Sequence, residues 1–167
     1  NWVHRYKYLS SDSNLGYVPY DDSKFEVHML SGIAGSGKDT YYRKHLSDLP
    51  MISLDDIRRE FKVKPTDKKG NGRVYQEAKE RCKVLMREKK SFVFNATNIV
   101  TDTRGKWTSL FETYKGKVTI HYIEVPYKTL LNQNHNREHK VPEKVINKMI
   151  SSLEIPTFDE AYDIIFV

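Results

Sequence analysis

The sequence contains one cysteine, Cys82, so no disulfide can form within the chain. It also lacks an apolar run long enough to cross a membrane, and its start shows no signal-peptide pattern. Eight glycines and six prolines among 167 residues, with 38% hydrophobic residues, give no sign of disorder. These absences favour a single cytoplasmic domain with a hydrophobic core and no membrane partner.

Positive charge is in moderate excess. The chain carries 28 Lys and Arg residues against 22 Asp and Glu, a formal net charge of +6 at pH 7, and its pI is about 9.2. Such a surplus favours a polyanionic partner. The ordinary charge of a solvated surface gives the same balance, so composition alone leaves both interpretations open.

A glycine-rich stretch, residues 32–40, organises the rest of the chain. Gly32 is followed after four residues by Gly37 and Lys38, with a strand-like segment before the stretch and a helix-like segment after it. In such a phosphate loop, backbone N–H groups converge on a phosphate at the positive end of a helix, and the lysine adds a point charge. The sequence therefore predicts a site for ATP or another nucleoside triphosphate. The predicted phosphate contacts are Gly32, Ala34, Gly35, Ser36, Gly37, Lys38, Asp39 and Thr40.

The residue after the lysine departs from the usual pattern of Ser or Thr, whose hydroxyl meets Mg²⁺. Asp39 holds that place here, and Thr40 comes next. We expect Asp39 to reach Mg²⁺ (or Mn²⁺) directly or through water, or Thr40 to do so in its place.

Strand-like and helical patterns alternate along the chain after residue 24. The predicted strands cover 25–31, 51–53, 91–95, 117–125 and 161–167. The predicted helices cover 39–48, 54–61, 74–89, 101–115, 126–137 and 143–153, with Thr101 as a candidate N-cap. This alternation predicts an α/β fold with a five-stranded, mainly parallel sheet and helices on both faces.

Two segments show no clear period. Residues 1–24 are rich in aromatic, serine and aspartate residues. We expect them to lead into a domain at 25–167 from an upstream domain; a trimmed tag or a processed terminus is the alternative. Residues 62–73 are predicted to form a mobile loop. Its cations are either solvated surface charge or a nucleic-acid rim: Lys62, Lys64, Lys68, Lys69 and Arg73.

A second candidate site follows the second predicted strand. Asp55 lies just past the carboxyl end of that strand, the edge where open α/β sheets bind ligands. A carboxylate there can accept the proton of a substrate hydroxyl. Arg58 stands one helical turn further on and can hold a phosphate bidentately. The alternatives are helix capping for Asp55 and a surface ion pair for Arg58.

Several motifs together resemble the polynucleotide 5′-hydroxyl kinases of phage, bacterial end-healing and tRNA-ligase type. The matching segments, which run through residues 25 to about 155, are 32–38, Leu54-Asp55-Asp56-Ile57-Arg58, Ala96-Thr97-Asn98, Asn134-His135-Asn136-Arg137 and Val141-Pro142. Segments 37–40 and 95–98 most resemble the kinase module that follows an HD-type phosphohydrolase domain in bacterial RNA and DNA repair proteins. An upstream phosphohydrolase domain would account for residues 1–24.

The resemblance implies a P-loop kinase fold and transfer of the γ-phosphate of an NTP to the 5′-OH end of RNA or DNA. It makes Asp55 the general base, and Arg58 the residue that grips the phosphate beside the acceptor nucleoside. It places Lys38 on the β and γ phosphates and makes Arg137 the lid arginine over the donor. Thr97 and Asn98 would line the acceptor side of the cleft.

Two further positions depart from the family pattern. A second lid arginine is replaced by Gln133, for which Arg104 or a loop lysine could compensate, and an acidic acceptor contact of some relatives is replaced by Ala96. A small-molecule P-loop kinase, acting on a sugar, antibiotic or nucleotide, is the alternative enzyme. A nucleotide-binding module without turnover is the alternative outside enzymes, and the presence of Asp55 argues against it.

Overall fold

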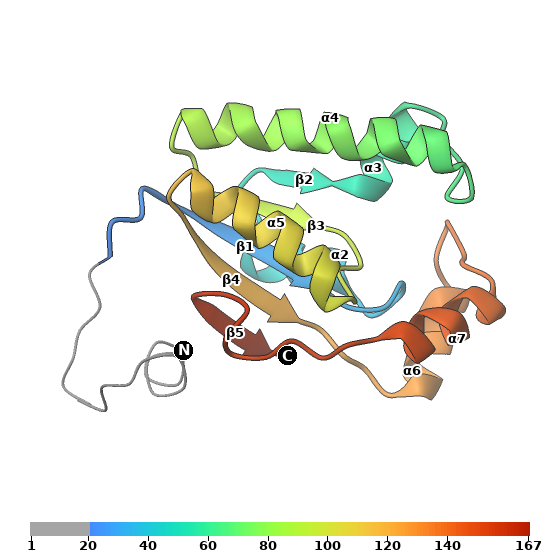
Figure 1. The fold of residues 1–167 in the computed structure, drawn as a ribbon. Coiled ribbons are helices and arrows are strands. Elements are labelled where there is room, and N and C mark those ends of the chain that lie inside the picture. The colour runs from blue at the N-terminus through green and yellow to red at the C-terminus, as the bar shows by residue number, and fades with distance from the viewer. Residues whose placement is uncertain (1–20) are drawn as a thin grey trace.

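Five strands form one sheet within residues 21–167, the part of the chain that the computed structural model describes. Their order is β2-β3-β1-β4-β5, and all four pairings are parallel (Figure 1). The strands are β1 (Phe25–Ser31), β2 (Met51–Ser53), β3 (Phe92–Asn95), β4 (Gly116–Tyr122) and β5 (Asp163–Phe166). The prediction of a five-stranded parallel sheet is confirmed.

The central strand, β1, is apolar because both of its faces are covered. Val27, Met29 and Leu30 are fully buried. The register pairs Leu30 with Asn95 of β3, and Asn95 with Ser53 of β2. The carboxyl ends of these three strands therefore meet at one edge of the sheet, and the loops that follow them converge there.

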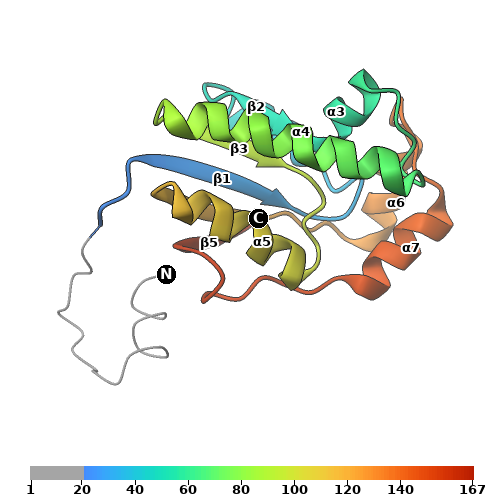
Figure 2. The same cartoon turned by 45° about the horizontal axis from the view of Figure 1, so that its top comes forward.

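Helices cover both faces of the sheet (Figures 1 and 2). One face carries α4 and α5, whose residues Cys82, Trp107 and Phe111 pack with the sheet in the main core. On the other face, Tyr41 of α2 packs against a second cluster that contains Leu30. The helices are α2 (Lys38–His45), α3 (Leu54–Glu60), α4 (Lys68–Arg87), α5 (Thr101–Thr113), α6 (Tyr127–His135) and α7 (Glu143–Ser152).

Helix α4 begins at Lys68, earlier than the predicted residue 74, so the prediction of a loop over 62–73 was wrong in its second half. Asp67 caps the helix by accepting a hydrogen bond from the Gly70 N–H at 2.9 Å. A side chain on Gly70 would lie 2.6 Å from Val63. Gly70 and Gly72, which indicated a loop, therefore lie inside the first turns of α4. Close packing against Val63 requires a glycine at position 70.

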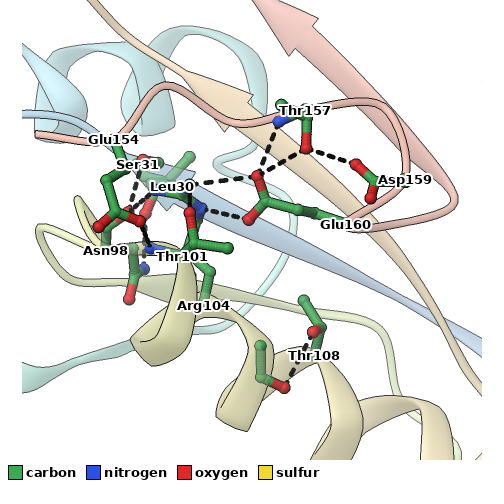
Figure 3. A network of polar contacts seen from close by, with 11 residues as sticks. Leu30, Ser31, Asn98, Thr101, Arg104, Thr108, Glu154, Thr157, Asp159 and Glu160 are labelled. Atoms are coloured by element: carbon green, nitrogen blue, oxygen red, sulfur yellow. Dashed lines mark hydrogen bonds and ion pairs between the residues drawn. The ribbon is translucent and has the colours of Figure 1, made fainter.

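The start of α5 also differs from the prediction, because Thr101 is the first residue of the helix rather than its N-cap. Val100 holds the cap position without a side-chain hydrogen bond. The N–H of Thr101 donates instead to the carboxylate of Glu154, at 2.9 Å, from the segment after α7 (Figure 3). A residue distant in sequence thus supplies the cap, which no local pattern could indicate.

Two predicted elements extend further along the chain than the observed ones. Strand β4 ends at Tyr122 rather than at 125, and α6 ends at His135, before Arg137. Most of the predicted lead-in segment, residues 1–20, lies outside the described residues, so its role as a linker stays a prediction. Among the described helices, none combines the length and apolarity that a membrane span requires.

A row of polar side chains crosses the sheet beneath α2. His28 of β1 and His121 of β4 share a hydrogen bond of 2.8 Å between Nδ1 and Nε2. The Tyr41 hydroxyl lies 2.8 Å from Nδ1 of His121. Burial, together with the neighbouring His28, lowers the pKa of His121 to about 4, so this imidazole is neutral at pH 7.

Candidate active site

A cavity of about 740 Å³ opens at the carboxyl edge of the sheet. Its lining brings together Lys38 and Asp39 from the phosphate loop, Asp55 and Arg58 from α3, and Arg137 from the turn after α6. Each of these residues follows the end of a strand or lies in a turn above that edge, so the parallel topology explains their meeting. The other predicted phosphate or acceptor residues in the lining are Ala34, Gly35, Gly37, Thr40 and Thr97.

The phosphate loop has the backbone geometry that its glycines allow. Gly35 and Gly37 have φ values of 89° and 96°, in the left-handed region. A side chain on Gly32 would come within 2.5 Å of the Ile123 carbonyl oxygen, so only glycine fits. The buried hydroxyl of Ser36 finds no hydrogen-bond partner among the described residues. Neither Gly32 nor Ser36 is part of the cavity lining, so they shape the loop from beneath.

The ammonium group of Lys38 lies within the loop itself. It donates hydrogen bonds to the carbonyl oxygens of Gly32 and Ile33, at 2.9 and 3.0 Å. Burial lowers its pKa to about 8, Asp55 and Asp39 oppose that shift, and Arg137 adds to it. The lysine is therefore charged at pH 7 and is placed where a phosphate above the loop can replace its carbonyl partners.

Asp39 lines the cavity with its carboxylate held in place. Its Oδ1 accepts a hydrogen bond from Nδ2 of Asn95 at 2.8 Å. Within the described part of the chain, the hydroxyl of Thr40 accepts one long hydrogen bond, from Nη2 of Arg43 at 3.5 Å. Carboxylate and hydroxyl oxygens are ligands that Mg²⁺ accepts, and in kinase sites one or two carboxylates with phosphate oxygens and water are sufficient. Both side chains line the cavity, and Asn95 holds the Asp39 carboxylate in an orientation that suits a metal ligand.

No ready-made metal cage accompanies Asp39. Within residues 21–167, no group of three or more His, Cys, Asp or Glu side chains is arranged to hold a metal ion. A metal at this place would thus depend on the phosphates of the nucleotide for most of its ligands.

Asp55 and Arg58 form an ion pair in the lining of the cavity that the phosphate loop also lines. Nη1 of Arg58 donates to Oδ1 of Asp55 at 2.6 Å, and its Nε donates to Oδ1 of Asn71 at 2.8 Å. The hydroxyl of Ser53 caps α3. Asp55 is therefore not the residue that caps the helix, and its carboxylate is 65% exposed at the cavity.

Asn71 is a site residue that the sequence did not reveal. It lies in the first turn of α4, accepts from Arg58, and donates from Nδ2 to the carbonyl oxygen of Pro65 at 2.8 Å. It therefore fixes both the arginine and the loop before the helix. Asp67 was the available signal, since a capping residue there places residue 71 inside a helix.

Thr97 and Asn98 occupy different places. Thr97 lines the cavity, and its carbonyl oxygen accepts the N–H of Gly32 at 2.9 Å. Asn98 is 2% exposed, is absent from the lining, and donates from Nδ2 to the carbonyl oxygen of Leu30 at 2.7 Å (Figure 3). Because its φ of 46° is left-handed, the turn directs this side chain toward β1. The structure thus gives Asn98 a place under the phosphate loop, away from the predicted acceptor side.

Arg104 does not compensate for the missing lid arginine. It is fully buried and pairs with Glu160, with its Nε 2.7 Å from Oε1 (Figure 3). Its Nη1 also donates to the carbonyl oxygen of Asn98 at 3.0 Å. Its positive charge is therefore used to hold the segment after α7 against α5 and the loop after β3.

Arg137 lies in the turn after α6, and Gln133 lines the same part of the cavity. Several cations that the sequence analysis did not assign to the site join them. Lysine and arginine side chains far outnumber the two carboxylates, Asp39 and Asp55, in the whole lining. The cations are Lys38, Arg43, Arg58, Arg59, Lys62, Lys64, Arg137 and Lys140. An anionic ligand is therefore favoured both at the phosphate loop and at α3.

Solved structures with a similar fold include several kinases. A sugar kinase of Janibacter sp. HTCC2649 is 18% identical over 86% of this chain and 84% of its own, with a TM-score of 0.63. The APS kinase CysC of Mycobacterium tuberculosis is 11% identical over 86% and 89%, with a TM-score of 0.59. A chain of the Pnkp1/Rnl/Hen1 RNA repair complex is 17% identical over 86% of this chain but 47% of its own, with a TM-score of 0.67. At these identities the likeness is one of fold.

No curated protein matches the sequence. The family model described as an AAA domain matches residues 27–156, from the first strand to the segment after α7. That range contains the phosphate loop, the Asp55–Arg58 pair and Arg137. Since the match spans well over half of the sequence, the chain belongs to this AAA-domain family and has a kinase-like P-loop fold.

Proposed function

We propose that the protein is a polynucleotide 5′-hydroxyl kinase. It transfers the γ-phosphate of ATP or another NTP to the 5′-OH end of RNA or DNA. The observation that carries the proposal is the composition of one cavity, which the Asp55–Arg58 pair and the phosphate loop line together with many cations. Such a cavity suits two anionic substrates, one on each side of the transferred phosphate.

The donor half would be formed by the phosphate loop and the turn after α6. Backbone N–H groups and Lys38 bind the β and γ phosphates, and Arg137 balances the charge that develops during transfer. Mg²⁺ or Mn²⁺ would supply further neutralisation of the phosphate oxygens, with Asp39 as the protein ligand or as the holder of a bridging water. Asn95 keeps the Asp39 carboxylate turned toward that position.

The acceptor half would be formed by α3. Asp55 accepts the proton of the 5′-OH while the oxygen forms its bond to the γ phosphorus and the NDP departs with the broken bond's electrons. Arg58 binds the phosphate next to the acceptor nucleoside. Since Arg58 donates to Asp55, a phosphate that attracts the guanidinium would also free the carboxylate to act as base.

Lys62 and Lys64 favour a polymeric acceptor over a small alcohol. Both line the cavity beside Arg58, and neither is part of an ion pair found within residues 21–167. An acceptor with one phosphate would satisfy Arg58 alone. Two further cations on that side suit the next phosphates of a nucleic acid strand.

The proposal is tested with labelled ATP and a graded series of acceptors: a nucleoside, its 3′-phosphate, and 5′-OH oligonucleotides of RNA and of DNA. We expect transfer to the oligonucleotides, weaker transfer to the 3′-phosphate, and loss of about 10²–10⁴-fold in the Asp55→Asn variant. Phosphorylation of sugars but of no oligonucleotide would sink the proposal and favour the small-molecule alternative. Lys144→Ala, at an exposed position of α7 outside the cavity lining, is the control variant.

The small-molecule alternative has its own support. The sugar kinase and the APS kinase match this chain over most of their own lengths, whereas the RNA repair chain does so over about half. The acceptor series separates the two, because a small-molecule kinase gains nothing from a longer oligonucleotide.

A further inference from the structure

Asn134 is buried in a helix turn whose neighbouring side chains are exposed. It is 7% exposed in the last turn of α6, while Asn132 and His135 face solvent. Both ends of its amide bind the backbone of Val141: Nδ2 donates to the carbonyl oxygen at 2.6 Å, and Oδ1 accepts the N–H at 2.9 Å. An amide side chain presents a donor and an acceptor side by side, so this pairing resembles one rung of a β-ladder.

The pairing closes a short loop that carries charged cavity residues. Residues 135–140 lie between Asn134 and Val141, and Arg137, His139 and Lys140 among them line the cavity. With both ends of the loop fastened to each other, its backbone loses much of the freedom of an open connection. The loop is therefore set in one orientation toward the cavity by a side chain that does not line it.

The same residue also contacts the phosphate loop. A side chain on Gly35 would lie 3.3 Å from Cβ of Asn134, so the two segments are already in close contact. At the other end of the pairing, Val141 packs on a cluster that contains Ile33 of the phosphate loop. The residues at both ends of the 135–140 loop thus pack against the phosphate loop, the segment that would hold the donor phosphates.

We propose that Asn134 is a positioning residue that holds Arg137 at the donor phosphates. The inference rests on the donor half of the proposed function and is independent of the acceptor. The Asn134 amide acts on Arg137 through the backbone of the loop, since it binds Val141 and does not line the cavity. Its effect should therefore require Arg137.

A double-mutant cycle tests this directly. The affinity for a non-hydrolysable ATP analogue with Mg²⁺ is measured by calorimetry for the wild type, Asn134→Ala, Arg137→Ala and the double variant. We expect Arg137→Ala to weaken binding about 10-fold or more, as for a lost charged contact. Asn134→Ala should weaken it by about 3- to 10-fold, and the double variant should match Arg137→Ala within about twofold.

Matched variants separate positioning from simple destabilisation. Asn132→Ala, on the exposed side of the same helix, should bind as the wild type does. Asn134→Asp keeps the acceptor for Val141 but sets an oxygen against its carbonyl, so it should behave like Asn134→Ala. If the losses in the double variant multiply, or if Asn134→Ala lowers only the melting temperature, the proposal is overturned.

Hydrogen exchange on the wild type provides a test that needs no variant. The Val141 N–H should exchange slowly, and the ATP analogue should protect residues 135–141 further. An exchange rate at Val141 equal to that of an open loop would contradict the inference. A protein that binds the analogue but phosphorylates no oligonucleotide would contradict the proposed acceptor only, and the cycle would still decide the role of Asn134.

Discussion

The ammonium group of Lys38 carries a charge that burial disfavours. Burial lowers its pKa from 10.5 to about 8, although the carboxylates of Asp55 and Asp39 act in the opposite direction. A bound triphosphate adds negative charge and raises the pKa again. Binding of the nucleotide and binding of one proton are therefore linked above pH 8.

This linkage predicts that nucleotide affinity falls as the pH rises from 7 to 9. The sign follows from the shift: the ammonium form binds phosphate, and it is lost as the pH passes the folded-state pKa of about 8. Calorimetry in two buffers of different ionisation enthalpy should show proton uptake at pH 8.5. Lys38→Arg, which keeps its charge over this range, should show a flat profile. A wild-type affinity that stays constant to pH 9 would contradict the assignment.

The metal role of Asp39 gives a second prediction. Asp39→Ala should raise the Mn²⁺ concentration needed for binding in the presence of the ATP analogue, as followed by electron paramagnetic resonance. Removing its partner with Asn95→Ala should cost about 10–100-fold in metal affinity, the usual effect of a ligand's supporting hydrogen bond. Thr40→Ala should leave the titration unchanged. The reverse result, with Thr40 sensitive and Asp39 silent, would assign the metal to the hydroxyl.

Site residues that directly follow a strand or belong to a motif were predictable, because their position depends on neighbouring residues in the sequence. Lys38, Asp55 and Arg58 follow strands whose apolar runs are plain in the sequence. Asn71 and Asn134 were assigned no role, since their partners lie in other segments. Side-chain hydrogen bonds to residues outside the helix leave no periodic trace in a single sequence.

At the scale of elements, helix starts were the least predictable feature. The sequence signals for a loop at 70–72 were real, but the Asp67 cap and the contact of Gly70 with Val63 outweighed them. At α5, the cap comes from Glu154. In both cases packing with another segment overrides a weak local preference.

The segment after α7 is joined to α5 by the pair of Arg104 and Glu160, with side chains 0% and 10% exposed. Arg104→Met should lower the free energy of unfolding by about 3–5 kcal/mol, because it leaves the largely buried Glu160 carboxylate without its charged partner. Urea denaturation measures the loss. Lys106→Ala removes an exposed pair with Asp102 on the same helix and should cost less than about 1 kcal/mol. Equal losses in the two variants would show that the buried pair has no special role.

For the whole molecule, the strand order places β1 between β3 and β4. The phosphate loop, which follows the central strand, thus lies at the middle of the carboxyl edge of the sheet. Helix α3 lies on one side of it and the turn after α6 on the other (Figure 1). The fold class and the meeting of the candidate residues followed from the alternation of strands and helices. The charge of the complete cavity did not, since it depends on which loops face one another.

That charge predicts a strong salt dependence of oligonucleotide binding. Lys62→Ala or Lys64→Ala should reduce the slope of log affinity against log salt concentration by about one unit each, since each lysine releases about one counterion. Fluorescence anisotropy with a labelled 5′-OH oligonucleotide measures the slope. Lys90→Ala, an exposed lysine outside the cavity lining, should leave it unchanged. Equal slopes for all three variants would place the nucleic acid elsewhere on the surface.

The two hydrogen bonds that join Tyr41, His121 and His28 run in one direction along the row. Nε2 of His28 lies 3.7 Å from the Glu26 carboxylate, which favours the neutral tautomer that carries its proton there and accepts at Nδ1 from His121. His121 then accepts at Nδ1 from the Tyr41 hydroxyl. A proton added to His28 turns its Nδ1 into a donor and reverses every hydrogen bond in the row. The orientation of a hydroxyl under α2 is thereby coupled to the protonation of an imidazole on the neighbouring strand.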